Sequence, residues 1–188
     1  MNSYYPKDKE DWRNWLKKNH LIKDSIWLIF NKKDSPNPNL NWSEAVDEAL
    51  CFGWIDSTKK SIDNEKYRQY FCKRKPKSNW SKVNKDKVET LIKQGLMKEA
   101  GYTSIETAKQ NGSWTFLDDV EACIIPEDLE EALANNKGAT EYFDSLSKSA
   151  KKILLYWVIS AKRPETRQKR VLEIAENAGM SVKPKQFR

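Results

Sequence analysis

The stretch WIDSTKKSIDNEKYRQYFCKR, residues 54–74, decides the fold that this sequence predicts. Residues 54–62 and 66–74 have the β-branched and aromatic content of strands, and the triplet Asp-Asn-Glu between them is typical of a turn. In the second arm Tyr67, Gln69 and Phe71 alternate with side chains of the opposite face. The stretch therefore predicts a β-hairpin.

The segments around the hairpin complete the predicted fold. Residues 26–30 form a continuous apolar run that predicts a buried strand, and the loop 34–39 (DSPNPN) follows it. Helices are expected over residues 9–20, 41–52 and 84–95, with Asn41 and Asn84 as N-caps. From residue 126 onward the pattern is helical. The fold class is α+β: a small antiparallel sheet with a β-hairpin packed by helices, followed by an all-helical C-terminal part.

We expect an α+β domain over residues 1–120, a helical module over 121–180, which packs on the first domain or stands alone, and a loose tail over 181–188. The most apolar run, residues 153–161 (ILLYWVISA), is about half the ~20 residues that a membrane span needs, so a buried helix is expected. The N-terminus has no apolar stretch typical of a signal peptide. These features predict a cytoplasmic protein without a membrane span.

Composition limits the chemistry. The chain has 8 Trp, 7 Tyr and 6 Phe, which predicts a core built largely from aromatic rings.

Its 3 Cys show no CxxC spacing and fit small core residues in a reducing compartment. His20 is the only histidine, which argues against a zinc site and against a Ser-His-Asp triad. It is expected to be an exposed residue at a helix end. No metal and no cofactor are expected.

Charge is distributed in blocks. Residues 59–98 carry 13 Lys and Arg against 4 Asp and Glu, whereas residues 116–147 carry 1 against 9 and residues 148–188 carry 11 against 3. Two basic blocks that enclose an acidic one indicate either a surface for an anionic ligand or segments that neutralise one another in the folded chain. The sequence leaves both interpretations open.

The segment KRKPKSNWS, residues 73–81, is the principal candidate for ligand binding. Lysine and arginine bind phosphates and carboxylates, and Trp80 can either stack on a ligand or anchor the loop in the core. Pro76 stiffens the segment. With neighbouring residues of the hairpin, the candidate ligand-binding set is Lys59, Lys60, Arg68, Arg74, Lys75, Lys77, Ser78, Asn79 and Trp80.

Two further sets of residues are weaker candidates. Arg163, Arg167 and Arg170 fall on one helical face as a second basic patch, which can bind phosphates or pair with the acidic block. Asp56 follows the junction between a helix and a strand, so it is a speculative general acid or base. Its simpler interpretation is a salt bridge with Lys59 or Lys60.

Three long strings carry a family resemblance: SEAVDEALCFGWIDS, RKPKSNWSKVNKDKVETLI and the helical region from PEDLEEALANN to KRPETRQKRV. Together they resemble the YdeI/OmpD-associated (bacteriocin-protection) family over about residues 10–177. The chain departs from the family pattern at Tyr70, where an arginine is usual, and at Lys73, where a proline is usual. The resemblance implies a link to protection against bacteriocins or antimicrobial peptides, and it implies no reaction and no catalytic residues.

The residues favour a non-enzymatic cytoplasmic protein that binds an anionic ligand or partner. The first alternative is a protein-interaction module that acts through the C-terminal helices. The second alternative is a small-molecule enzyme with Asp56 as acid or base. Nucleic acid is a less favoured partner because the acidic block would repel a long polyanion. The oligomeric state stays open.

Overall fold

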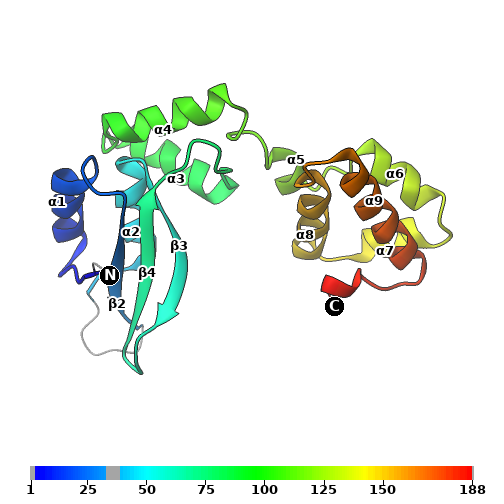
Figure 1. Cartoon of the computed structure of the whole chain (residues 1–188), viewed down its shortest axis with the longest axis horizontal. Helices are drawn as coiled ribbons and strands as arrows, with labels where there is room; N and C mark the ends of the chain where they lie inside the picture. The colour runs from blue at the N-terminus through cyan, green and yellow to red at the C-terminus, as the bar shows by residue number, and fades with distance from the viewer. Residues whose placement is uncertain (1–2, 33–38, 188) are drawn as a thin grey trace. The chain divides into compact units, whose positions relative to one another are not determined.

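The computed structural model describes residues 3–32 and 39–187. The chain forms two compact units, Met1–Phe116 and Leu117–Arg188 (Figure 1). The first contains the sheet and four helices of the described chain, and the regular elements of the second, within its described residues, are all helices. This architecture confirms the α+β class. Residues 34–38 of the predicted loop lie outside the described residues.

A four-stranded sheet organises the first unit, with strand order β1-β2-β4-β3. The strands are β1 (Ser3–Tyr4), β2 (Ser25–Asn31), β3 (Trp54–Ser61) and β4 (Lys66–Lys73). The predicted hairpin is present as β3 and β4, and β2 pairs antiparallel with β4. The sheet is mixed rather than purely antiparallel, because β1 pairs parallel with β2. A two-residue strand is too short to leave a periodic pattern in the sequence.

The register of the sheet sorts its side chains into two faces. Ile26 lies opposite Phe71 and Leu28 opposite Gln69, and all four are buried on the face toward the helices. Trp27 and Tyr70 are paired on the opposite face. Between Asp56 and Lys59 the pairing of β3 with β4 shifts, which marks an irregularity in the edge strand.

Helices α1 (Lys9–Asn19) and α2 (Trp42–Cys51) cover the inner face with aromatic packing. The Trp12 ring is fully buried against Phe71, and its Nε1 donates to the Ala45 carbonyl at 3.1 Å. A buried indole needs such an acceptor to avoid an unpaired polar group. Asn41 caps α2 as predicted, because its side chain accepts a hydrogen bond from the Ser43 N–H.

Helices α3 (Lys82–Lys93) and α4 (Glu99–Gln110) complete the first unit. The predicted N-cap Asn84 is wrong: Ser81 caps α3 by accepting from the Asn84 N–H at 3.3 Å. Asn84 is therefore inside the first turn. Both residue types are good N-caps, so the cap was placed three residues too late along the chain.

The second unit consists of α5 (Asp118–Glu121), α6 (Glu127–Ala134), α7 (Ala139–Ser145), α8 (Lys148–Ile159), α9 (Pro164–Gly179) and the short 3-10 helix η1 (Lys185–Phe187). Its core contains Leu129, Phe143 and Leu155. The helix predicted to be buried, α8, is amphipathic instead: Ile153 is 51% exposed and Tyr156 is 45% exposed. In the tail that was expected to be loose, the Phe187 ring lies 5.4 Å from that of Trp157. Across the described residues, no helix is long and apolar enough to cross a bilayer.

Candidate cleft for an anionic ligand

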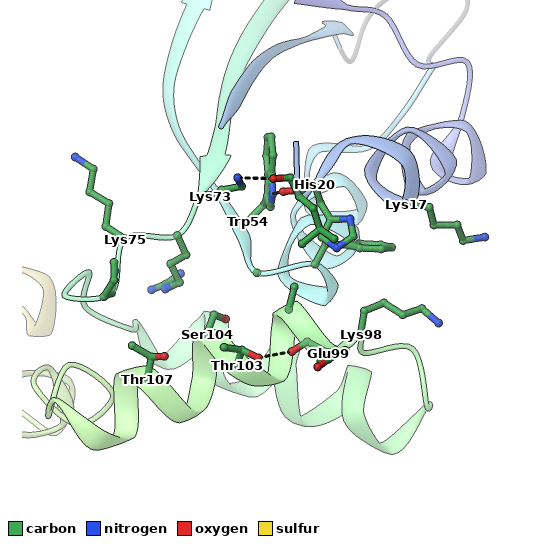
Figure 2. Close-up of a pocket in the computed structure, with 16 residues that line it drawn as sticks. Lys17, His20, Trp54, Lys73, Lys75, Lys98, Glu99, Thr103, Ser104 and Thr107 are labelled. Atoms are coloured by element: carbon green, nitrogen blue, oxygen red, sulfur yellow. Dashed lines mark hydrogen bonds between the residues drawn. The ribbon is translucent and has the colours of Figure 1, made fainter. Parts of the chain in front are cut away.

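A cleft of about 930 Å³ opens on the first unit, where four chain segments meet. The C-terminal end of α1, the end of α2 with the start of β3, and the segment after β4 form one side, and α4 forms the other (Figure 2). Its lining includes the apolar side chains Leu21, Phe52, Trp54, Pro76 and Ala100. An organic molecule with an apolar body would therefore find complementary surface here.

Two glycines allow α4 to form the wall of the cleft. Gly53 has a φ of +71°, and a Cβ atom there would lie 2.6 Å from the Ala100 carbonyl oxygen. A Cβ at Gly101 would lie 2.5 Å from the Cys51 carbonyl oxygen. Real Cβ atoms do not approach so closely, so the distance between α4 and the end of α2 depends on the absence of these side chains.

Arg74 is the least satisfied cation of the lining. Its guanidinium lies 3.7 Å from the centre of the Trp80 ring, and Nη2 donates to the Asn79 carbonyl at 2.5 Å. Its Nε and Nη1 are buried and have no hydrogen-bond partner within the described chain. Burial lowers the pKa of Arg74 to about 10, because desolvation disfavours the charged form. A nearby anion would offset this cost.

The other basic side chains of the cleft differ in what they already contact. Lys73 donates to the Leu21 carbonyl at 2.9 Å and pairs with Asp24 at 3.0 Å, so its charge is partly compensated. Lys17, Lys75 and Lys98 are exposed at the rim. Glu99 is the acid of the described lining. The cleft therefore carries an excess of positive charge.

The face of α4 toward the cleft carries a row of hydroxyl groups (Figure 2). The Thr103 hydroxyl donates to the Glu99 carbonyl at 2.9 Å, and the Ser104 hydroxyl donates to the Gly101 carbonyl at 2.8 Å. The half-buried Thr107 lines the same wall, and its hydroxyl has no partner in the described part of the chain. Thr107 can therefore donate to a bound anion.

His20 and Trp54 form the inner part of the cleft, and Figure 2 shows them between the lysines of the rim. The His20 ring packs 5.0 Å from Phe52, and its Nδ1 lies 2.8 Å from the Leu16 carbonyl oxygen. The Trp54 Nε1 donates to the His20 carbonyl at 3.3 Å. His20 is half-buried and lines a cleft, whereas the sequence indicated an exposed residue at a helix end.

The structure brings part of the predicted loop to the cleft. Arg74 and Lys75 line it, and Trp80 supports Arg74 from a buried position, 1% exposed. Asn79 contributes its carbonyl group, and the Ser78 hydroxyl donates to the Lys75 carbonyl at 2.8 Å. Lys77 is exposed and lies outside the lining. The ligand-binding role of these residues stays a prediction.

The predicted residues of the hairpin lie outside the cleft lining. Lys59 lies over the Tyr67 ring at 4.1 Å. Lys60 and Arg68 lie over the Trp27 ring at 5.6 and 4.6 Å. These contacts on aromatic rings provide a structural role for the three cations.

The speculative catalytic residue Asp56 is occupied by structural contacts. Its Oδ2 accepts hydrogen bonds from Trp42 Nε1 at 2.9 Å and from Gln69 Nε2 at 2.8 Å. The expected salt bridge with Lys59 or Lys60 is absent from the described ion pairs. Asp56 links α2 to the hairpin and lies outside the cleft lining.

Two of the three arginines of the second basic patch already have partners within the helical unit. Arg167 makes a bidentate pair with Asp128, with Nε at 2.6 Å and Nη2 at 2.8 Å from the carboxylate. Arg170 donates from Nη1 to the Trp157 carbonyl at 2.5 Å. Arg163 is exposed at the start of α9. The pair with Asp128 joins this helix to the acidic block that the sequence offered as an alternative partner.

Several lining residues were not predicted from the sequence, namely Lys17, His20, Lys98, Ser104 and Thr107. They come from helices that are distant from the basic loop along the chain. Gly53 and Gly101 were the features of the sequence that could have indicated this wall of the cleft, because a glycine allows two backbones to approach closely. Neither glycine identifies the segment that it approaches.

The mixed sheet with its cationic cleft and the second, helical unit define a two-unit α+β protein. Residues 4–104 match the family model described as a domain of unknown function (DUF8412), and since the match spans more than half of the chain, the chain belongs to that family. Residues 122–179 match the Bacteriocin-protection, YdeI or OmpD-Associated model. The predicted resemblance is confirmed over this narrower range. No curated protein and no solved structure matches the chain.

Proposed function

We propose that the first unit binds a small organic anion in the cleft beside α4, without catalysing a reaction. The observation that carries the proposal is the environment of Arg74: two of its nitrogens are buried without partners, in the wall of a largely apolar cleft. A buried cation without a counter-charge lowers the stability of the fold. A protein retains such a group where a bound ligand supplies the missing negative charge.

The chemistry of the lining defines what such a ligand looks like. A carboxylate or phosphate group would lie near Arg74 and Lys75 and accept from the Thr107 hydroxyl. Its apolar body would contact Phe52 and Trp54. Charge-assisted hydrogen bonds contribute roughly 1.5–3 kcal/mol each, so the head group would dominate the affinity. The family match of residues 122–179 supports a bacteriocin-protection-related role, and a cytoplasmic location is part of the proposal.

Titration calorimetry of the full chain at low salt tests this function. The probes are short aliphatic and aromatic carboxylates and phosphate monoesters at concentrations up to about 10 mM. We expect Arg74→Met to weaken binding by about tenfold or more, since tenfold corresponds to about 1.4 kcal/mol. The matched control is Lys77→Ala, which removes a charge from the same loop outside the cleft.

Two results would contradict the proposal. One is that no carboxylate or phosphate ester binds the unmodified protein in this range. The other is that Arg74→Met and Lys77→Ala bind as tightly as the unmodified protein. The Met variant is expected to fold, because it replaces an incompletely paired buried group with a shorter, flexible apolar chain that leaves no buried donor unpaired.

A further inference from the structure

The cleft carries basic side chains at both of its ends. Figure 2 shows Lys75 on the left of the cleft and Lys17 with Lys98 on the right, with Trp54 and His20 between them. We propose that the preferred ligand is a dianion: two anionic groups joined by a short apolar linker. The inference rests on the proposed function and specifies the class of ligand.

The first anionic group would lie at the end of the cleft that follows β4. Arg74 supplies a guanidinium with two buried, unpartnered nitrogens, and the exposed Lys75 is free to turn toward it. Thr107 on α4 lines the same cleft with a hydroxyl that can donate. Two charges and a neutral donor are sufficient to bind one carboxylate or phosphate group.

The second anionic group would lie at the end formed by α1 and the start of α4. Lys17 is in the last turn of α1, and Lys98 is the N-cap residue of α4. The side chain of Lys98 makes no capping hydrogen bond, so it leaves the first-turn N–H groups of this 12-residue helix available to donate to an anion. Positive side chains, together with a helix N-terminus, favour an anion here despite the exposed Glu99.

The region between the two ends is largely apolar, and the polar groups there are already engaged: the Thr103 and Ser104 hydroxyls donate to carbonyls of their own helix, and Lys73 is paired with Asp24. Phe52 and Trp54 lie on one side of the cleft and Ala100 on the other, and the packing of His20 on Phe52 extends this surface. A second anionic group placed in the middle of the cleft would lose its hydration without gaining a hydrogen bond or an ion pair in return. A linker of methylene groups or an aromatic ring fits this part of the cleft, which favours α,ω-dianions over compact polyanions.

A monoanion would leave the basic residues of one end without a counter-charge. Across the cleft Lys17, Arg74, Lys75 and Lys98 face the single acid Glu99, since Lys73 is paired with Asp24. Each additional neutralised cation at the protein surface contributes modestly, because solvent screens it. The expected advantage of a dianion over a monoanion is therefore about tenfold in affinity.

The test compares dicarboxylates with monocarboxylates of the same carbon number, by calorimetry on the full chain. The series runs over several linker lengths and includes an aromatic dicarboxylate. We expect the best dicarboxylate to bind about tenfold more tightly than its monocarboxylate. The double variant Lys17→Ala/Lys98→Ala should abolish this advantage, because it weakens binding of the dicarboxylate much more than binding of the monocarboxylate. Lys18→Ala, next to Lys17 but outside the lining, should change neither affinity.

The outcomes separate this inference from the proposed function. Equal affinity for the mono- and dicarboxylates overturns the dianion proposal while the anion-binding function stands. The same holds if the double variant weakens both classes equally. Failure of all carboxylates and of the corresponding bisphosphonates to bind overturns both proposals. Tighter binding of a bisphosphonate than of a dicarboxylate supports the dianion and assigns phosphate-like head groups.

Discussion

Glu48 is a carboxylate buried in the core of the first unit, 1% exposed. It is paired with Arg13 through a short hydrogen bond and lies 3.5 Å from the Lys9 ammonium. Arg13 also donates to the Leu96 carbonyl at 2.8 Å. This pair therefore joins α1 to α2 and to the segment that precedes α4, and so it helps to set the geometry of the cleft.

Removal of Arg13 should be costly because it leaves Glu48 buried without its main partner. We expect Arg13→Met to destabilise the first unit by about 3 kcal/mol, at the lower end of the range for broken buried pairs since Lys9 stays nearby. The double variant Arg13→Met/Glu48→Met should recover most of this loss. Urea unfolding followed by tryptophan fluorescence measures the effect, because seven of the eight Trp residues lie in this unit.

A double variant that is no more stable than Arg13→Met would contradict this account. It would mean that the aliphatic contacts of the two side chains, rather than the unpaired charge, determine the stability.

Asp128 makes the stability of the second unit depend on pH. The hydrogen bonds from Arg167 hold the pKa of this carboxyl below its usual range. The pair therefore stabilises the fold fully above the unfolded pKa of about 3.9, and this stability is lost as the pH falls through the lower folded pKa. We expect Asp128→Asn to speed hydrogen exchange in α6 and α9 at pH 7, with the difference from the unmodified protein disappearing in acid.

Asp119→Asn is the control, because it removes an exposed acid of the same unit. If the difference between Asp128→Asn and the unmodified protein is constant between pH 7 and pH 2.5, the pair does not contribute in this way.

At the residue scale, the sequence identified the side chains that a single segment contains. Arg74, Lys75 and the buried Trp80 are close together along the chain, so the basic loop was visible before the fold. Lys17 and Lys98 join them only through the packing of α1 and α4. The partners of Asp56 could not be predicted either, since Trp42 and Gln69 reach it from different elements.

Helix α4 is the element on which the cleft depends most. Gly101→Ala would place a methyl group 2.5 Å from the Cys51 carbonyl oxygen, so α4 must move away from α2. We expect a loss of stability of about 1–3 kcal/mol, typical of overpacking, together with weaker binding of the anion. Urea unfolding and calorimetry measure the two effects.

Gly179→Ala is the matched control for this substitution. The contacts of a Cβ at Gly179, at the end of α9, begin at 3.5 Å, which is ordinary van der Waals distance. Alanine is favoured over glycine in a helix by roughly 0.5–1 kcal/mol. Unchanged or higher stability is expected there, whereas a Gly101→Ala protein of unchanged stability would show that the close approach is easily relieved.

Elements with a strong periodic pattern were predicted correctly. The hairpin, the buried strand at residues 26–30 and the helix capped by Asn41 all show in the sequence, because each buries one face or one continuous run. The start of α3 and the presence of β1 could not be predicted from the sequence. Ser81 and Asn84 are both good caps, and β1 is defined only by its pairing with β2.

At the scale of the whole molecule, each unit contains its own hydrophobic core. One core surrounds Trp12, Trp54 and Phe71, and the other surrounds Leu129 and Leu155. All described lining residues of the cleft belong to the first unit. We expect residues 1–116 and 117–188, expressed separately, each to give dispersed NMR spectra.

The fragment 1–116 should bind the anion within about twofold of the full chain. A folded fragment that loses binding would show that the site needs residues from 117–188.

The two edges of the sheet are both poor templates for another strand. β1, at one edge, has only two residues, and β3, at the other, combines its shifted pairing with the exposed Lys59 and Lys60. Short edges, irregular pairing and lysines are the devices by which sheet proteins avoid edge-to-edge aggregation. A protein with this sheet should stay dispersed at high concentration, and the lysines of the hairpin would then be retained for solubility rather than for recognition.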